Sequence, residues 1–191
     1  MNTLEAIAAR RSIRQFTDAP IPEDVLHTIL KAATQAPSGK NRQPWRFIVV
    51  TGDKRSDMVR VMRDGIAKAK ARGEGLGSAE SSARIMEQAP VTVFVFNPHG
   101  SHPYLAHSIG EMFDDLVNVQ SIGAAIQNML LAAQDLGIGS LWICDVFFAY
   151  DELCAWLGEQ CEMIAAVSLG YPDEHPNARP RRPVGKVAHW L

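Results

Sequence analysis

The chain has 191 residues, 47% of them hydrophobic, and a formal net charge of −2 at pH 7. This length and composition predict a folded chain with a substantial core and exclude an intrinsically disordered one. The nearly balanced charge gives no global attraction to nucleic acid or to an anionic membrane, so a site that binds an anion has to be local.

The three cysteines, Cys144, Cys154 and Cys161, form no CxxC pair. A sparse and odd set argues against a disulfide framework and favours a reducing compartment, so we predict a cytoplasmic protein. The first turns contain Glu5 and two arginines instead of a continuous apolar segment, which argues against a signal peptide. The most apolar segment, residues 122–133, contains two amide side chains and is too short to span a membrane.

The chain opens with a short helical pattern that leads into a cluster of arginines. Leu4 and Ala8 belong to an apolar stripe with Thr3 as the expected N-cap, so the helix should end close to Arg10. The segment RRSIR, residues 10–14, holds three guanidinium groups and one hydroxyl. A helix C-terminus is the negative end of the dipole, so an anion bound here needs several side-chain cations. The alternative is that the arginines only neutralise the last helical carbonyls, which explains one or two of them.

A second helix is predicted to begin near Pro22, and the polar loop after it is a second candidate site. The loop, residues 37–45, reads PSGKNRQPW and precedes a strand-like segment at 46–50. Its hydroxyl, glycine and amide are able to satisfy the alternating donors and acceptors at the edge of a heteroaromatic ring. The alternative is an ordinary surface loop.

Together, RRSIR and PSGKNRQPW resemble the FMN-dependent nitroreductase family, whose members read R-R/H-S-x-R/K early and P-S-x-x-N-x-Q-P-W before the first long strand. The stretch from Gly123 through Gly139 to Ile143 and the closing RPRRP are also similar to the family. The resemblance implies one FMN-binding domain over residues 1–191. It further implies an α+β nitroreductase-like fold with a central mixed sheet flanked by helices. The resemblance also implies a homodimer that binds FMN at its interface, with a C-terminal extension of each chain that crosses to the partner.

The middle of the chain alternates between helical and strand patterns. Helices are predicted over 53–71 and 79–87, followed by a strand at 91–96 whose continuous apolar run suits burial on both faces. The spaced glycines of residues 73–78 follow a helix instead of a strand, so they do not form a dinucleotide-binding fingerprint.

Three histidines, His99, His102 and His107, lie at short spacing in the next loop. No cysteine accompanies them and no HExxH motif occurs, so a loop surface or a substrate pocket is favoured over a metal site. Residues 99–115 are expected to distinguish the reductive dehalogenase and flavin-fragmenting branches of the family from its other members.

The second half contains one long helical pattern, at 108–136, that is apolar over a wide arc and is therefore expected to be buried on more than one side. We interpret it as a core helix, and the resemblance adds a role in the dimer interface. Strands are predicted at 140–144 and 163–169, with a helix near 151–157 between them. The three prolines within 173–191 predict an extended tail.

The resemblance implies FMN contacts from four parts of the chain. Arginines and Ser12 are expected to hold the phosphate, the loop at Ser38 to contact the ring edge, and backbone N–H groups after the third strand to approach the ring, which makes Cys144 a bystander. No side chain is assigned as a catalytic acid or base, because FMN carries the chemistry. The expected contacts are Arg10, Arg11, Ser12, Arg14, Pro37, Ser38, Gly39, Asn41, Ile143, Cys144, Asp145, Arg179 and Arg181.

The implied activity is reduction of a nitroaromatic, a quinone or a similar small acceptor by NAD(P)H in a ping-pong cycle on FMN. Reductive dehalogenase and flavin-fragmenting branches of the family stay open. So do a flavin carrier without turnover and a phosphate-binding protein whose arginines serve another anionic partner. The arginines of the tail also have an alternative reading, as a solvated basic end. Nucleic acid, membrane and metal ions are not expected as partners.

Overall fold

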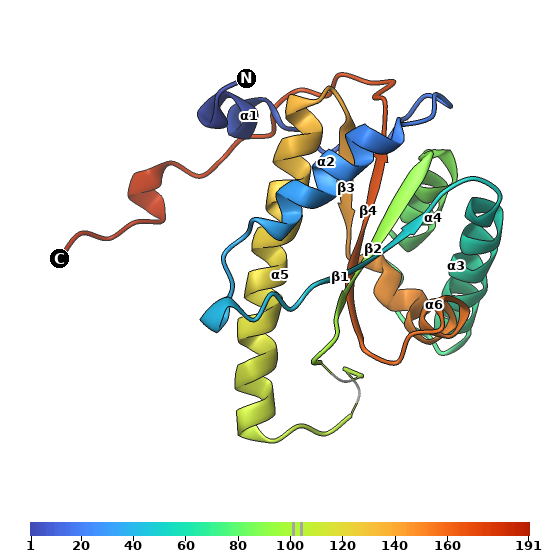
Figure 1. Ribbon diagram of the computed structural model, residues 1–191. Coiled ribbons are helices and arrows are strands. Elements are labelled where there is room, and N and C mark those ends of the chain that lie inside the picture. The colour runs from blue at the N-terminus through green and yellow to red at the C-terminus, as the bar shows by residue number, and fades with distance from the viewer. Residues whose placement is uncertain (101, 104) are drawn as a thin grey trace.

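The computed structural model describes residues 1–100, 102–103 and 105–191, and it places one four-stranded sheet between two groups of helices (Figure 1). The strands lie in the order β1-β2-β4-β3, where β1 is Arg46–Val50, β2 Val91–Asn97, β3 Gly139–Ile143 and β4 Glu162–Gly170. The α-helices are α1 Thr3–Ala9, α2 Glu23–Thr34, α3 Lys54–Ala71, α4 Ala79–Gln88, α5 Ile109–Asp135 and α6 Tyr150–Leu157, and the 3-10 helices are η1 Gly39–Asn41, η2 Asp145–Ala149 and η3 Val184–Lys186.

All three pairings between these strands are antiparallel, which differs from the predicted mixed sheet. Strands β2 and β3 come directly before and after α5 in the chain, and they run in the same direction. In the sheet, β4 lies between them and runs opposite to both. The parallel neighbours that a β-α-β unit would create are therefore separated. Among the described residues, parallel pairing is limited to an isolated bridge between Ser12 and Ser140.

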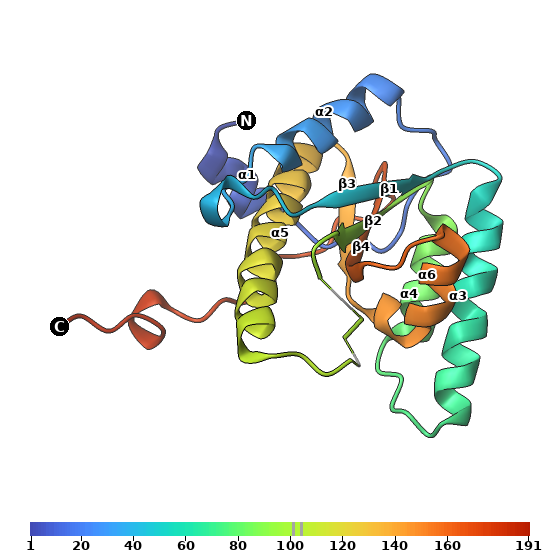
Figure 2. The same cartoon turned by 60° about the horizontal axis from the view of Figure 1, so that its bottom comes forward.

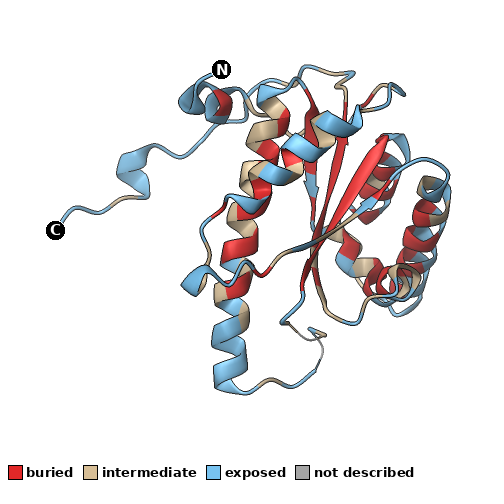
Figure 3. Cartoon of the chain, in the orientation of Figure 1, coloured by how far each residue is buried: buried red, intermediate tan, exposed pale blue. Residues whose placement is uncertain are grey.

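Strand β2 is buried along its whole length because helices cover both faces of the sheet (Figure 3). Phe94 and Phe96 pack on one face with apolar residues of α3, α4 and η2, while Val93 and Val95 pack on the other face with α2 and α5. This arrangement confirms the burial predicted from the continuous apolar run. It also places α4 and α5 on opposite sides of the sheet (Figure 2).

Helix α1 ends where the arginine cluster begins. Its N-cap is Asn2 and not the predicted Thr3, because the side chains and backbones of Asn2 and Glu5 form a reciprocal capping box. Arg10 has an extended backbone (φ −55°, ψ 132°), so the helix does not continue and Arg10 and Arg14 share no helical face. The C-terminal tail is extended as predicted, apart from the 3-10 turn η3.

Helix α5 is buried over only part of its length, which corrects the expectation of burial on several sides. From Asn118 onward it packs against α2 and the sheet, but four apolar residues near its start lie in solvent with exposed fractions of 55–87%: Ile109, Met112, Phe113 and Leu116. These four have the i, i+3, i+4, i+7 spacing of one helical face. By length and hydropathy α5 would also reach across a membrane, but its packing is that of a core helix.

The register between β2 and β4 shifts between Val95 and Phe96, and Tyr150 forms a hydrogen bond with β4 next to this shift. The Met163 N–H donates to the Tyr150 hydroxyl at 3.0 Å in a buried position. Burial raises the pKa of Tyr150, so its hydroxyl stays neutral.

Tyr150→Phe is expected to lower the free energy of unfolding by about 1–3 kcal/mol, because a buried backbone donor would lose its acceptor. Chemical denaturation of the two proteins measures this difference. Tyr171 is partly buried, and its hydroxyl has no described hydrogen bond, so Tyr171→Phe serves as the matched control. Equal stability of all three proteins would contradict the assignment.

Candidate functional site

Two distant segments of the chain meet in a cleft lined by five arginines. RRSIR contributes Arg10, Arg11, Ser12 and Arg14, and the tail contributes Arg179 and Arg181 together with Pro176 and Asn177. The cleft has a volume of about 180 Å³. The fold thus brings together six of the residues that were predicted to contact FMN.

The guanidinium groups of this cleft are close together and carry the same charge. None of the five arginines forms an ion pair with a carboxylate within the described ranges. Partial burial, followed by the charges of Arg181 and Arg11, lowers the pKa of Arg10. A bound dianion would relieve this repulsion and supply an acceptor to each guanidinium.

The arginines of the first segment have different local roles. Arg11 donates to the carbonyls of Ala8 (2.7 Å) and Arg10 (2.9 Å), so it also neutralises the end of α1 as the alternative interpretation expected. Arg14 donates through its side chain to the carbonyl of Ser12 and through its backbone N–H to Glu174. Arg10 is half-buried and Arg179 is exposed, and neither guanidinium has a described hydrogen bond, so both are available to a ligand.

The cleft lies beside the start of β3. The Ile13 N–H donates to the Ser140 carbonyl at 3.0 Å, and Gly139 lacks the Cβ that would press on the buried Ile13 side chain. Because β3 is at the edge of the sheet, this short contact leaves the rest of its outer edge without a neighbouring strand in the described chain. From Ser140 the strand leads to Cys144, about 13 Å away.

At the end of β3, Ile143 is buried, Cys144 is exposed and Asp145 is half-buried. Although Cys144 is exposed as a residue, partial burial of its thiol and then the Asp145 carboxylate raise the pKa of that thiol, which disfavours the nucleophilic thiolate. The Asp145 carboxylate accepts hydrogen bonds from Ser78 and Ser82, each 2.6 Å long. Sequence reasoning missed both serines, because no local pattern connects residues 63 and 67 positions apart.

The loop around η1 is held in an unusual backbone conformation. Lys40, Asn41 and Gln43 have φ values between 51° and 54°, a left-handed region that costs a non-glycine residue of order 1 kcal/mol or more. The Gln43 N–H donates to the Ser38 hydroxyl at 3.0 Å, and the Gly39 N–H donates to the Ser121 hydroxyl of α5 at 3.3 Å. Pro37 and the Asn41 amide are exposed. Such strain is typical of loops that present groups to a ligand.

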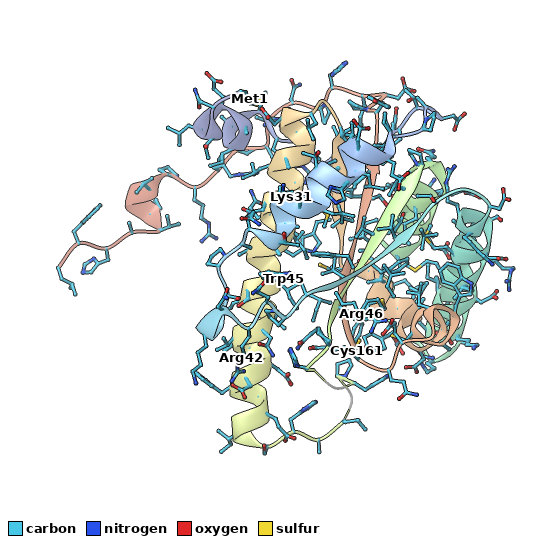
Figure 4. All side chains as sticks on the ribbon, viewed as in Figure 1. Met1, Lys31, Arg42, Trp45, Arg46 and Cys161 are labelled. Atoms are coloured by element: carbon cyan, nitrogen blue, oxygen red, sulfur yellow. The ribbon has the colours of Figure 1, made fainter. Side chains whose placement is uncertain are left out.

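The structure does not bring this loop to the arginine cleft. Gly39 contacts α5 at Ser121, whereas the cleft lies beyond Asp135 at the other end of the helix, about 20 Å further along its axis. In Figure 4, Met1, whose terminal amine pairs with Asp135 at the end of α5, lies far from Arg42 in the loop. In Figures 1 and 2, α5 lies between η1 and β3. Within one chain, the predicted ring contacts therefore face different sides of α5.

The three histidines do not gather around a common point. His102 Nε2 lies 2.7 Å from Asp151 Oδ1, and His107 Nδ1 lies 3.7 Å from Asp115 Oδ2. The described residues contain no group of three or more His, Cys, Asp or Glu side chains arranged for a metal ion. The segment 99–115, which was expected to distinguish the branches of the family, includes Ser101 and Tyr104, and these two lie outside the described residues.

A larger cleft, of about 570 Å³, lies at α3 and the end of α4, far from the arginine cleft. Its charges are largely paired within the protein: Arg63 lies 2.7 Å from Glu87, and Arg55 donates to the Glu87 carbonyl at 2.8 Å. A cleft with paired charges has less need of an ionic ligand than the arginine cleft, so we place the candidate site at the arginines.

Known proteins resemble the chain over most of its length. A family model described as the Nitroreductase family matches residues 7–171. A protein of Archaeoglobus fulgidus assigned as an NADH dehydrogenase/NAD(P)H nitroreductase is 34% identical over 176 residues, which cover 90% of this chain and 86% of the relative. An NADPH-flavin oxidoreductase of Vibrio harveyi is 28% identical over 193 residues, covering 98% and 73%.

The fold also matches a solved structure with a flavin. A Desulfovibrio desulfuricans protein, assigned as a nitroreductase and crystallised in complex with FMN, superposes with a TM-score of 0.76 at 28% sequence identity. The match covers 100% of this chain and 98% of that protein.

Proposed function

The chain belongs to the nitroreductase family, and from this premise we propose that it transfers reducing equivalents from NAD(P)H to an electron-poor small molecule such as a nitroaromatic or a quinone. It is a flavin oxidoreductase whose cofactor is FMN, as its relatives and the FMN-bound neighbour support. The proposal for this chain rests on the cleft of five arginines without carboxylate partners in the described residues. We further propose that residues 1–191 act as one domain in the cytoplasm.

The donors of the cleft fit a phosphate monoester. Arg10 and Arg181 would supply charge-assisted hydrogen bonds, and the Ser12 hydroxyl would donate a third. The span of about 13 Å from Ser140 to Cys144 suits a ribityl chain followed by the near part of a flavin ring. The ring would then lie along the outer edge of β3, with the backbone N–H groups of residues 143–145 at its far end.

The protein's own groups position the cofactor and adjust its electrostatics, and we assign no proton transfer to a side chain. FMN, when bound, supplies the hydride chemistry that serves NAD(P)H and the acceptor in turn. Backbone N–H donors near the ring would stabilise negative charge that develops on reduction. The exposed end of β3 at Trp142 and Cys144 leaves room for a second molecule to approach.

We propose a homodimer in which the loop at Ser38 belongs to the site of the partner subunit. Two features support this arrangement. The loop and the end of β3 face different sides of α5 in one chain, and no described residue covers the apolar face formed by Ile109, Met112, Phe113 and Leu116. A second copy would cover that face. The tail beyond Pro183 projects away from its own domain in Figure 1, as a segment that crosses to a partner would.

The visible absorption spectrum of the purified protein, with and without added FMN, tests the cofactor. A flavin spectrum, together with steady-state oxidation of NADH or NADPH in the presence of a nitroaromatic or a quinone, is the expected result. Flavin that binds without turnover would instead favour a carrier. A protein that takes up no FMN would overturn the proposal.

Mixing two defective variants tests the shared site. One carries Arg10→Ala and Arg181→Ala, and the other carries Ser38→Ala and Asn41→Ala, so a mixed dimer has one intact site only if cleft and loop come from different chains. We expect tagged mixed dimers, purified after co-expression, to bind one FMN while each parent dimer binds it weakly. Mixed dimers that bind no better than the parents would place both elements in one chain's site.

A further inference from the structure

The Asp145 carboxylate has no cationic partner in the described part of the chain, and two hydroxyls hold it instead. Ser78 and Ser82 donate to the same oxygen, Oδ2, over 2.6 Å each. Ser78 occupies the N-cap position of α4 but makes no side-chain bond to the helix backbone, because its hydroxyl is directed to Asp145. Ser82 lies one turn later and is only 6% exposed.

The carboxylate therefore lies at the start of α4, where the positive end of the helix dipole and two charge-assisted hydrogen bonds favour it. Helix α4 packs on the sheet face opposite α5. The adjacent Val146 is 2% exposed and packs in the core, which leaves the backbone at Cys144 and Asp145 little freedom. The two serines thus determine where the negative charge beside the end of β3 lies.

We propose that Ser78 and Ser82 are positioning residues for FMN, which hold the Asp145 carboxylate against α4 and so set the reduction potential of the bound flavin. This inference rests on the proposed function, because it requires FMN at the outer edge of β3. A carboxylate without its two donors carries a less compensated charge and is free to turn toward the ring. Negative charge beside the ring disfavours reduction, since the ring gains electron density when it accepts a hydride.

The two kinds of substitution should have opposite effects. Ser78→Ala with Ser82→Ala should shift the equilibrium between oxidised and reduced FMN about tenfold toward the oxidised form, which equals about 30 mV for a two-electron couple. Asp145→Asn removes the charge and keeps an oxygen acceptor, so it should shift the equilibrium the other way. Ser81→Ala, on the same helix but without a described bond to Asp145, is the matched control and should match the wild type.

Potentials are measured by anaerobic titration of FMN-loaded protein with a reference dye. Hydrogen exchange at residues 144–147 of the FMN-free protein gives a second reading, in which the double serine variant should exchange faster than the Ser81→Ala control. Shifts of the same sign in the serine and Asp145→Asn variants, or unchanged potentials in both, would overturn the proposal. Wild-type protein that binds no FMN would contradict the proposed function instead. In that case, unchanged hydrogen exchange in the double serine variant would show that Ser78 and Ser82 do not hold the segment at Asp145. If the double variant does not fold, Ser78→Ala, at an exposed position, is judged by the same criteria with smaller shifts.

Discussion

Replacing Arg10 and Arg181 together by alanine is expected to weaken FMN binding by about a hundredfold or more. The FMN phosphate would lose one charge-assisted hydrogen bond with each guanidinium that is removed, and each such bond contributes about 1.5–3 kcal/mol to the free energy of binding. We expect the loss of binding free energy for the two bonds together to lie at the lower end of the combined range, because removing either cation also relieves repulsion within the cleft. Arg181 contributes to the lowered pKa of Arg10. Fluorescence titration of FMN into the stripped protein measures the change in dissociation constant.

The same variant separates binding from folding. The FMN-free double variant should unfold at a denaturant concentration equal to or higher than that of the wild type, because like charges have been removed from one cleft. Arg182→Ala is the matched control: the residue lies in the same exposed tail but does not line the cleft, so FMN affinity should stay within about twofold. Equal losses in the control and the double variant would mean that the whole tail attracts FMN nonspecifically.

Gly65→Ala is expected to destabilise the protein by about 3 kcal/mol. A Cβ at this buried position of α3 would lie 2.3 Å from the Cβ and 2.5 Å from the Cα of Ala149. The obstacle includes backbone of η2, which cannot rotate away, so the cost belongs at the upper end of the range for overpacking. Thermal denaturation should show a melting temperature lower by about 10 °C.

The control for this substitution is Gly110→Ala, at a helical position of α5 where a Cβ meets nothing within 4 Å. It should be neutral or stabilise the protein by up to about 1 kcal/mol, since alanine is the better helix former. Because η2 begins at Asp145, the displaced α3 should also weaken FMN binding in Gly65→Ala. A Gly65→Ala protein as stable as Gly110→Ala would show that η2 moves without cost.

Local patterns in the sequence were sufficient for most of the elements. The strand at 46–50, the helix at 53–71 and the strand at 91–96 agree with β1, α3 and β2 to within a residue or so, because side-chain periodicity and the capping residues act over a few positions. The charged character of RRSIR and of the tail at Arg179 and Arg181 could also be read directly. The resemblance to a family supplied the expectation that these two segments serve one phosphate.

Relations between distant segments were decided only by the tertiary structure. The insertion of β4 between β2 and β3 made the sheet antiparallel, and α5 separated the loop at Ser38 from the arginine cleft. The hydrogen bonds from Ser78 and Ser82 to Asp145 also had no local sequence pattern that predicts them, since a serine before a helix ordinarily caps that helix.

The physical reason for this division is the range over which each interaction acts. The sequence by itself determined where helices and strands form and which segments carry cations, because backbone conformation and charge depend on a residue and its near neighbours. Only the tertiary structure decided that Arg10 and Arg181 share one cleft, since burial of the core brings together groups that are 171 positions apart along the chain. The residues of the arginine cleft could thus be predicted from the sequence, but only the fold brings them together.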